Sequence, residues 1–187
     1  MALSRHDINR ERTISSIEDA FLIEYAAKGI EGISITGLCK SSGVSRSTFY
    51  LYFDDKYAVL ESIEKRLLDG FLLVNQDMPY VTDPIAPNTH PQQVLEFLFE
   101  NEKWFKALLG PHGDPGFHYR WKKVIIKTLY DRLADKKVDK KNAEIQGAIF
   151  SSGLIGLFTY ILFEKPNVSN ELLGRYMTKL LAFSLRL

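Results

Sequence analysis

The stretch from Ser34 to Phe53 holds the side chains with the clearest chemistry in this chain. It contains no aspartate or glutamate, and its two cations are Lys40 and Arg46. Its nine hydroxyl-bearing residues are Ser34, Thr36, Ser41, Ser42, Ser45, Ser47, Thr48, Tyr50 and Tyr52. Neutral donors and positive charge without any acid suit contact with phosphate oxygens and base edges. The segment therefore predicts DNA binding.

Two short helices joined by a tight turn are predicted to position these side chains. Ser34 and Ser45 are suited to cap the two helices, because a serine hydroxyl accepts a free backbone N–H of the first turn. Gly43 between them can adopt the left-handed conformation that ends a helix. Phe49 and Phe53, four residues apart, are predicted to bury one face of the second helix. This is a helix-turn-helix, whose second helix enters the major groove.

The pattern resembles the DNA-binding domain of the tetracycline-repressor (TetR) family of transcriptional regulators. The matching elements are Gly43-Val44-Ser45, Thr48-Phe49-Tyr50, Tyr52-Phe53 and Lys56, preceded by Ala20, Phe21, Tyr25 and Gly29. The chain departs from the family pattern at Gly37, within the first short helix, and at Ser41 and Ser42, where small residues like alanine are more usual. The resemblance implies a DNA-binding regulator and not an enzyme.

The resemblance also assigns roles to individual residues. Arg46, Ser47 and Tyr50 are expected to read base edges. Ser34, Thr36, Thr48, Tyr52 and Lys56 are expected to hold phosphates, and Ser45, which caps the recognition helix, is also expected to contact DNA. The bland alternative is that Tyr50 and Tyr52 pack in the core and that Lys56 is an ordinary solvated lysine. Arg46 is the strongest candidate for reading sequence, because arginine matches the paired acceptors of guanine.

The whole chain is predicted to be all-α, with a three-helix DNA-binding domain at 1–53 and a helical regulatory and dimerisation domain at 54–187. A connecting helix is expected at 54–77, and four prolines indicate a loop at 78–91. Further helices are expected at 91–109, with a break near Asn101, at 117–138 and at 142–164. A last helix is expected to start after a cap at Ser169 or Asn170 and to bury Leu172, Leu173, Tyr176, Leu180 and Phe183.

The last two helices are expected to form a homodimer interface, as the resemblance implies. Ala148, Ser152 and Gly156 recur every four residues, so a partner helix could approach that face closely. On the final helix the interface candidates are Tyr176, Leu180 and Phe183. Two DNA-binding domains about one turn of the DNA helix apart would suit a near-palindromic operator.

The TetR resemblance implies that the helical body can hold a small-molecule effector, whose identity is unknown, and that no cofactor is required. The segment from Phe99 to Gly110, with the turn His112-Gly113-Asp114, resembles the TetR subgroup that includes regulators of dihydroxyacetone kinase genes. Pocket candidates are the body aromatics, which are also typical core residues: Phe97, Trp104, Phe105, Trp121, Tyr130, Phe150 and Tyr160.

Composition favours a cytoplasmic protein. The single cysteine, Cys39, is compatible with a reducing compartment, and no apolar segment of a secretory signal opens the sequence. Nineteen uncharged residues separate Glu144 from Glu164, but their polar side chains and small-residue face favour a core helix over a membrane span. At the amino end, Arg5, Arg10 and Arg12 are predicted to form either an arm that reaches DNA or a solvated tail.

Three other functions remain open on the sequence. An enzyme would need His112, Asp114 and His118 to act together, but their spacing matches no metal-ligand pattern and no nucleophile accompanies them. The leading prediction is a ligand-responsive repressor. A TetR-like activator, or a coactivator that works with a partner protein, is the alternative. A helical interaction module that has lost DNA binding is the third.

Overall fold

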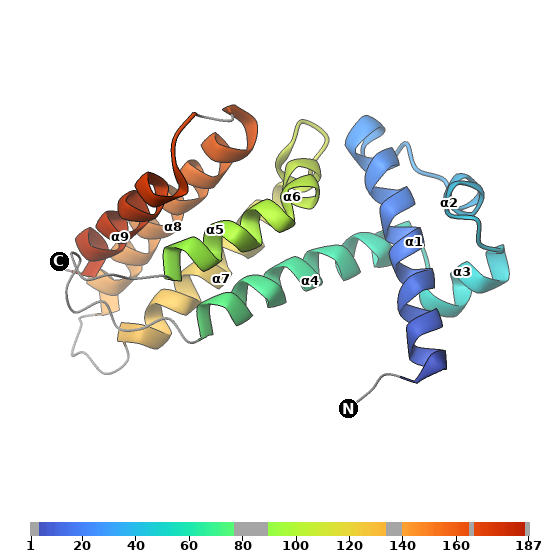
Figure 1. Ribbon diagram of the computed structural model, residues 1–187, viewed down its shortest axis with the longest axis horizontal. Coiled ribbons are helices and arrows are strands. Elements are labelled where there is room, and N and C mark those ends of the chain that lie inside the picture. The colour runs from blue at the N-terminus through green and yellow to red at the C-terminus, as the bar shows by residue number, and fades with distance from the viewer. Residues whose placement is uncertain (1–3, 77–89, 134–139, 165–166, 186–187) are drawn as a thin grey trace. The chain divides into compact units, whose positions relative to one another are not determined.

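The computed structural model describes residues 4–76, 90–133, 140–164 and 167–185. Within these ranges the chain forms nine α-helices and no strand, which confirms the all-α prediction (Figure 1). The helices are α1 (Arg5–Lys28), α2 (Ile35–Ser42), α3 (Arg46–Tyr52), α4 (Lys56–Gln76), α5 (His90–Glu100), α6 (Glu102–Leu109), α7 (Pro115–Leu133), α8 (Lys140–Glu164) and α9 (Asn170–Leu185).

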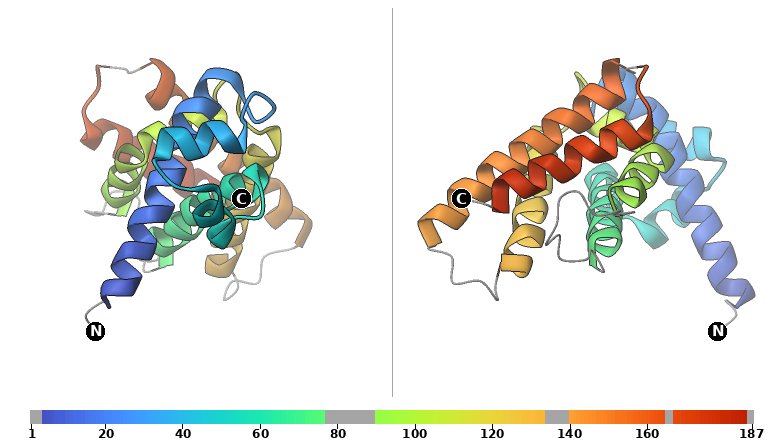
Figure 2. Two further views of the ribbon diagram at one scale, coloured as in Figure 1. Left: turned by 90° about the vertical axis from the view of Figure 1, so that its right-hand side faces the viewer. Right: turned by 60° about the vertical axis from the view of Figure 1, so that its left-hand side comes forward.

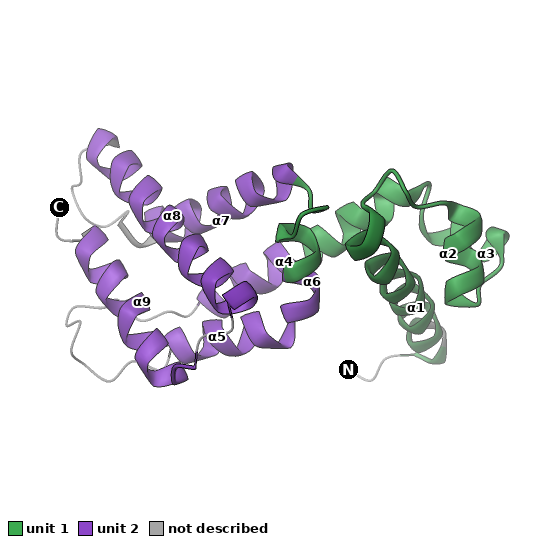
Figure 3. Cartoon of the chain, turned by 90° about the horizontal axis from the view of Figure 1, so that it is seen from above, with its two compact units in different colours: residues 1–66, 106–114 green, residues 67–105, 115–187 purple. Residues whose placement is uncertain are grey.

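The chain divides into two compact units, shown in Figure 3. The first, here called the head, comprises residues 1–66 and 106–114, and the second, the body, comprises residues 67–105 and 115–187. The head includes the first part of α4, where Val59 and Ile63 are buried. A domain boundary after residue 53 stays a prediction. The proline-rich loop predicted at 78–91 lies mostly outside the described residues.

The amino end of the chain is helical. The Ser4 hydroxyl accepts a hydrogen bond from the Asp7 N–H, and the Asp7 carboxylate accepts one from the Ser4 N–H, both at 3.2 Å. This reciprocal pair is a capping box, which starts α1 at Arg5. Arg5, Arg10 and Arg12 therefore belong to a helix, so the solvated tail is wrong, whereas contact of this segment with DNA stays a prediction.

Serine caps and one glycine define α2 and α3, as the sequence predicted. The Ser34 hydroxyl accepts from the Gly37 N–H and the Ser45 hydroxyl accepts from the Thr48 N–H, each at 3.0 Å. Gly43, with φ of 70°, ends α2 in the left-handed conformation that glycine adopts without steric cost. Gly37 also has a structural reason, because a Cβ there would lie 3.0 Å from the capping Ser34 hydroxyl.

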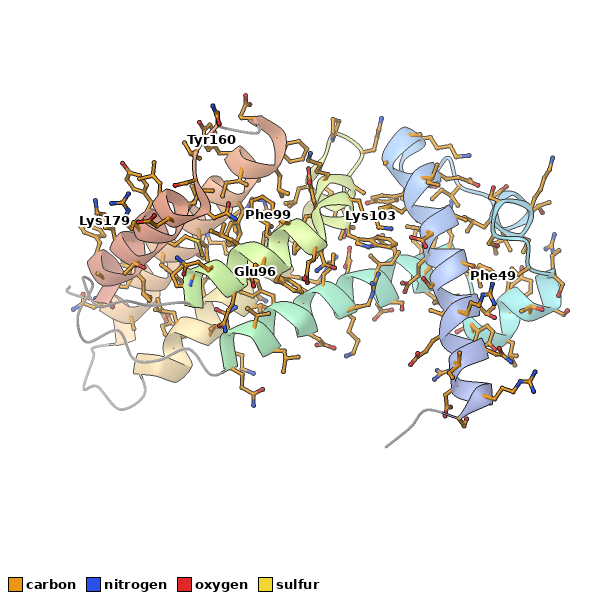
Figure 4. All side chains as sticks on the ribbon, in the orientation of Figure 1. Phe49, Glu96, Phe99, Lys103, Tyr160 and Lys179 are labelled. Atoms are coloured by element: carbon orange, nitrogen blue, oxygen red, sulfur yellow. The ribbon has the colours of Figure 1, made fainter. Side chains whose placement is uncertain are left out.

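The head has a continuous apolar core. Its most deeply buried side chains come from α1, α2, α3 and α4: Ile17, Phe21, Tyr25, Leu38, Phe49, Val59 and Ile63. Figure 4 marks Phe49, the side chain that anchors α3. Burial of each of these side chains stabilises the folded state by about 1.5–3 kcal/mol relative to leaving it exposed. The burial of Phe49 also fixes which face of α3 points outward.

A buried carboxylate joins α1 to α4 within the head. Glu18 of α1 is 5% exposed, accepts from the Ser62 hydroxyl at 3.0 Å and forms an ion pair with Arg66 at 3.0 Å. Burial raises the pKa of Glu18 above its usual 4.5, although the Arg66 charge and the Ser62 hydrogen bond both act to lower it.

The body is built around stacked aromatic rings. The fully buried Trp121 of α7 lies 4.8 Å from the Phe105 ring, 5.5 Å from Phe158 and 6.0 Å from Phe117, all in stacked geometry. Phe71 meets the same indole edge-on at 5.9 Å. Rings from α4, α6, α7 and α8 thus share one core, while α7 packs on α8, and α9 packs on both α8 and α5 (Figure 2).

Two predictions about the body helices have different outcomes. The predicted break near Asn101 is confirmed, because Asn101 separates α5 from α6 and its side-chain amide donates to the Phe97 carbonyl at 2.9 Å. The predicted buried face of the last helix is wrong at Tyr176 and Phe183, which are 55% and 56% exposed. The prediction is confirmed at Leu173, and the other buried residues of α9 are Gly174, Met177, Thr178, Leu181 and Ser184.

The apolar helix α8 meets the length and composition of a membrane span over Lys141–Glu164, and among the described residues it is the one helix that does. Half of its most apolar window is buried inside the protein. Core helices of soluble proteins share these properties, so the finding is weak evidence for a membrane.

Candidate nucleic-acid interface

Helix α3 presents a polar face and anchors itself with one aromatic residue. Phe49 is fully buried, and its ring lies 5.9 Å from the Phe53 ring and 5.5 Å from the Tyr50 ring. This anchoring leaves the opposite side of the helix open. The exposed residues of α3 are Arg46, Ser47, Tyr50 and Leu51.

Arg46 is held by neighbours from two helices. Its Nη1 donates to the Thr36 hydroxyl of α2 at 3.1 Å, and its Nη2 donates to the Tyr50 hydroxyl at 3.5 Å. The guanidinium also lies 6.0 Å from the centre of the Tyr50 ring, at the limit of a cation–π contact. The three side chains therefore form one cluster, and Thr36 contacts the predicted base reader itself.

The hydroxyls at the start of α3 form a second cluster. The Ser45 hydroxyl lies 2.8 Å from the hydroxyl of Ser47 and 2.8 Å from that of Thr48, in addition to capping the helix. Ser45 and Ser47 are exposed and Thr48 is half-buried. Hydroxyls can both donate and accept, so this cluster can offer donors to an oxygen of the DNA while keeping its internal bonds.

Lys56 occupies a more interior position than expected. Its side chain is 18% exposed, and its ammonium donates to the Ile33 carbonyl at 3.3 Å and lies 3.8 Å from the Glu31 carboxylate. Lys56 thus ties the start of α4 to the turn before α2. The remaining predicted phosphate ligands differ in access, since Ser34 is exposed and Tyr52 is half-buried.

The carboxylate of Glu24 on α1, which contacts α2, has its charge compensated by an ion pair. Glu24 accepts from the Ser41 hydroxyl of α2 at 3.2 Å and pairs with Lys28 at 3.0 Å. Since the segment from Ser34 to Phe53 has no acid of its own, the exposed face of α3 carries positive and neutral groups only. A phosphate backbone could approach that face without a repelling carboxylate on it.

The sequence reasoning missed Leu51. This side chain is 73% exposed on α3, next to Tyr50 and one helical turn after Ser47. The sequence did indicate that Leu51 is exposed, because it lies two residues from both Phe49 and Phe53 and therefore away from the buried face of the helix.

The pocket candidates do not form a single group. Phe97, Phe105 and Trp121 belong to the aromatic core, with the Phe97 and Phe105 rings 6.0 Å apart. Trp104 and Phe150 are buried, and Tyr130 is half-buried. Tyr160 is 49% exposed on α8 and lies outside this core (Figure 4). Among the described atoms, the buried Trp121 indole N–H has no hydrogen-bond acceptor.

The interface candidates lie on an outward-facing side of α8 and α9. Ser152 and Gly156 are exposed, Ala148 and Leu180 are half-buried, and a Cβ added at Gly156 would meet no atom within 4 Å. Large apolar side chains continue this face. We call it the outer face, and its exposed apolar members are Ile145, Ile149, Tyr160 and Phe163 of α8 with Tyr176 and Phe183 of α9.

The three candidates for catalysis do not form a metal site. Among the residues that the structure describes, no group of three or more histidine, cysteine, aspartate or glutamate side chains could hold a metal ion. His112 and Asp114 belong to the head, whereas His118 belongs to the body.

The head is a helix-turn-helix DNA-binding domain, as its fold and the absence of acidic residues from its recognition helix indicate. Residues 19–63 match the family described as bacterial regulatory proteins, tetR family. The match lies within the head, which therefore has the DNA-binding domain of TetR-family transcriptional regulators, a family of regulators and not of enzymes.

A curated relative and two solved structures resemble the chain. The relative is an uncharacterised HTH-type transcriptional regulator, YxbF of Bacillus subtilis (strain 168), which is 24% identical over 102 residues. The match covers 53% of this chain and 27% of that protein, so the chain spans about a quarter of the curated relative's length. The TetR-family regulator SCO0857 of Streptomyces coelicolor A3 shares the fold, with a TM-score of 0.50, 13% identity, and coverage of 92% of this chain and 96% of that one. A proposed TetR-family regulator from Mesorhizobium loti MAFF303099 has a TM-score of 0.47 and 14% identity, with coverage of 94% and 96%.

Proposed function

We propose that the protein is a cytoplasmic, ligand-responsive repressor that binds a near-palindromic operator as a homodimer. The observation that carries this proposal is the exposed face of α3. Arg46, Ser47 and Tyr50 are all exposed there, no acid lies in the segment, and Phe49 fixes the helix from below. Such a face combines base-edge readers with phosphate-compatible hydroxyls.

The proposed roles follow the geometry of the head. Arg46 reads a base edge, and Ser47 and Tyr50 contact the bases beside it. Ser34, Ser45, Thr48 and Tyr52 supply hydroxyls for the phosphate backbone on either side. Thr36 and Lys56 have internal partners, so their contribution is to hold Arg46 and the turn before α2 in place.

The outer face of α8 and α9 supports the homodimer. An apolar patch of large side chains on a soluble regulator is typical of an interaction surface. The small residues Ser152 and Gly156 lie within it, and they would allow a second copy of α8 to approach closely. A two-fold dimer of this kind would carry two heads, which matches the two half-sites of a near-palindrome.

The aromatic core of the body supports ligand response. The Trp121 N–H is a buried donor without an acceptor among the described atoms. A buried unsatisfied donor favours a ligand that supplies a hydrogen-bond acceptor. A ligand that binds better to a body conformation incompatible with DNA would release the operator by a population shift.

The test of DNA reading begins with selection of duplexes from a random-sequence library by the full chain. Fluorescence anisotropy then compares Arg46→Ala with Lys40→Ala, a matched loss of one exposed cation from the same segment. Arg46→Ala should weaken the selected duplex more than a random duplex, by about 5- to 150-fold. Lys40→Ala should weaken both duplexes alike. Equal behaviour of the two variants would contradict the proposed role of α3.

Repression itself is tested in cells. A reporter driven by a promoter that contains the selected sequence should rise in activity when the gene for this chain is deleted. A fall on deletion would instead indicate an activator.

A further inference from the structure

Leu51 is an apolar side chain in the middle of a polar reading face. It is 73% exposed, although α3 already buries Phe49 and ends against the buried Phe53. A single exposed leucine is common on protein surfaces and needs no explanation by itself. Its position gives it meaning, because Leu51 lies one turn after Ser47 and next to Tyr50.

Four exposed side chains make a compact patch on α3. Residues four apart lie above one another on a helix, so Arg46 aligns with Tyr50 and Ser47 aligns with Leu51. The 3.5 Å bond from the Arg46 guanidinium to the Tyr50 hydroxyl confirms the first of these alignments. Any duplex that Arg46 and Ser47 contact would therefore lie against Leu51 as well.

The chemistry of the leucine side chain restricts what it can recognise. Its isobutyl group has no donor or acceptor, so it cannot read the polar edge of any base. The major groove offers one apolar group among the four bases, the 5-methyl of thymine. A phosphate is excluded as the partner, because an apolar side chain would desolvate it without compensation.

We propose that Leu51 reads the 5-methyl group of a thymine in each operator half-site. This inference rests on the proposed function, since it requires α3 to lie in the major groove. It adds to the hydrogen-bonding readers a specificity determinant that distinguishes thymine from cytosine and from uracil.

The experiment uses the full chain and the duplex recovered by the selection described above. Each thymine of that duplex is replaced in turn by uracil, which removes only the methyl group and keeps every hydrogen-bonding atom. The unmodified protein should lose affinity by about three- to tenfold at one thymine of each half-site. Leu51→Ala should bind thymine and uracil equally at that position.

A matched control comes from the body. Leu73 on α4 is 69% exposed, close to the exposure of Leu51, so Leu73→Ala removes a comparable side chain from a different unit. This variant should keep the full preference for thymine. Circular dichroism should show unchanged helicity for both variants, because neither side chain is part of a core.

Two outcomes overturn the inference alone. One is a protein that tolerates uracil at every position of the selected duplex. The other is a Leu51→Ala variant that retains the thymine preference. A selection that enriches no sequence would overturn the proposed function, and this inference with it.

Discussion

The contact between Thr36 and Arg46 makes a prediction that separates two roles for Thr36. The family resemblance assigns its hydroxyl to a phosphate, whereas in the structure that hydroxyl accepts a hydrogen bond from Arg46 Nη1 at 3.1 Å. Thr36→Val removes the hydroxyl and keeps the size and β-branching of the side chain. We expect it to weaken specific binding through Arg46.

The magnitude follows from the exposure of the pair. An arginine side chain has about 2 kcal/mol of rotamer entropy, part of which a prior hydrogen bond removes before DNA binds. Arg46 and Thr36 are both exposed, so solvent screens the bond and its net effect should be at the low end, about 0.5–1 kcal/mol. The dissociation constant of the selected duplex should therefore rise about two- to fivefold.

The assay is fluorescence anisotropy at one fixed salt concentration, with the selected duplex and a random duplex. Thr36→Val should affect only the selected duplex, and Thr36→Ser should restore its binding. In an Arg46→Ala background the same substitution should have no further effect, because its partner is gone. A loss that is equal for random DNA, or that persists without Arg46, would refute the reasoning and return Thr36 to a phosphate contact.

Three further predictions concern stability and assembly. Ser45→Ala should lower the free energy of unfolding in urea by about 1 kcal/mol, because it removes the cap of α3, and an unchanged midpoint would mean that the cap contributes nothing. Glu18→Gln should gain stability relative to the unmodified protein as pH rises from about 4.5. The folded state keeps the Glu18 proton to higher pH than the unfolded chain does. The unmodified protein therefore loses stability as pH rises from the unfolded pKa of this carboxyl to its raised folded pKa. Parallel pH profiles of urea unfolding for the two proteins would contradict this. The proposed homodimer interface predicts that Gly156→Arg shifts the protein from dimer to monomer in analytical ultracentrifugation, whereas Gly156→Ala does not, since only the larger side chain would block an approaching helix.

Local chemistry made the boundaries of α2 and α3 predictable. Ser34, Gly43 and Ser45 act on backbone groups within three to five residues of themselves, so their roles depend on neighbours that the sequence shows directly. The burial of Phe49 follows in the same way from helical spacing. The start of α1 was predictable too, because Ser4 and Asp7 have the spacing of a capping box, although the expectation for the flanking arginines was an arm or a solvated tail.

Contacts between distant residues were not predictable. Thr36 and Arg46 are ten residues apart, and Lys56 is 23 residues from the Ile33 carbonyl that it contacts, so both pairings depend on how the helices cross. On α9 the prediction placed Tyr176 on the buried side, although the neighbouring Met177 is also large and apolar. Packing against α5 and α8 decides in favour of Met177, which is 6% exposed.

The chain has two tryptophans, Trp104 and Trp121, and both belong to the body. Tryptophan fluorescence therefore reports on the body alone, while circular dichroism in the far ultraviolet reports on the helices of both units. Because both indoles are buried, melting of the body should shift the emission to longer wavelength. If the two signals give superimposable denaturation curves, the units unfold as one cooperative block; if they do not, the head and the body have separate stabilities that can be measured in a single sample.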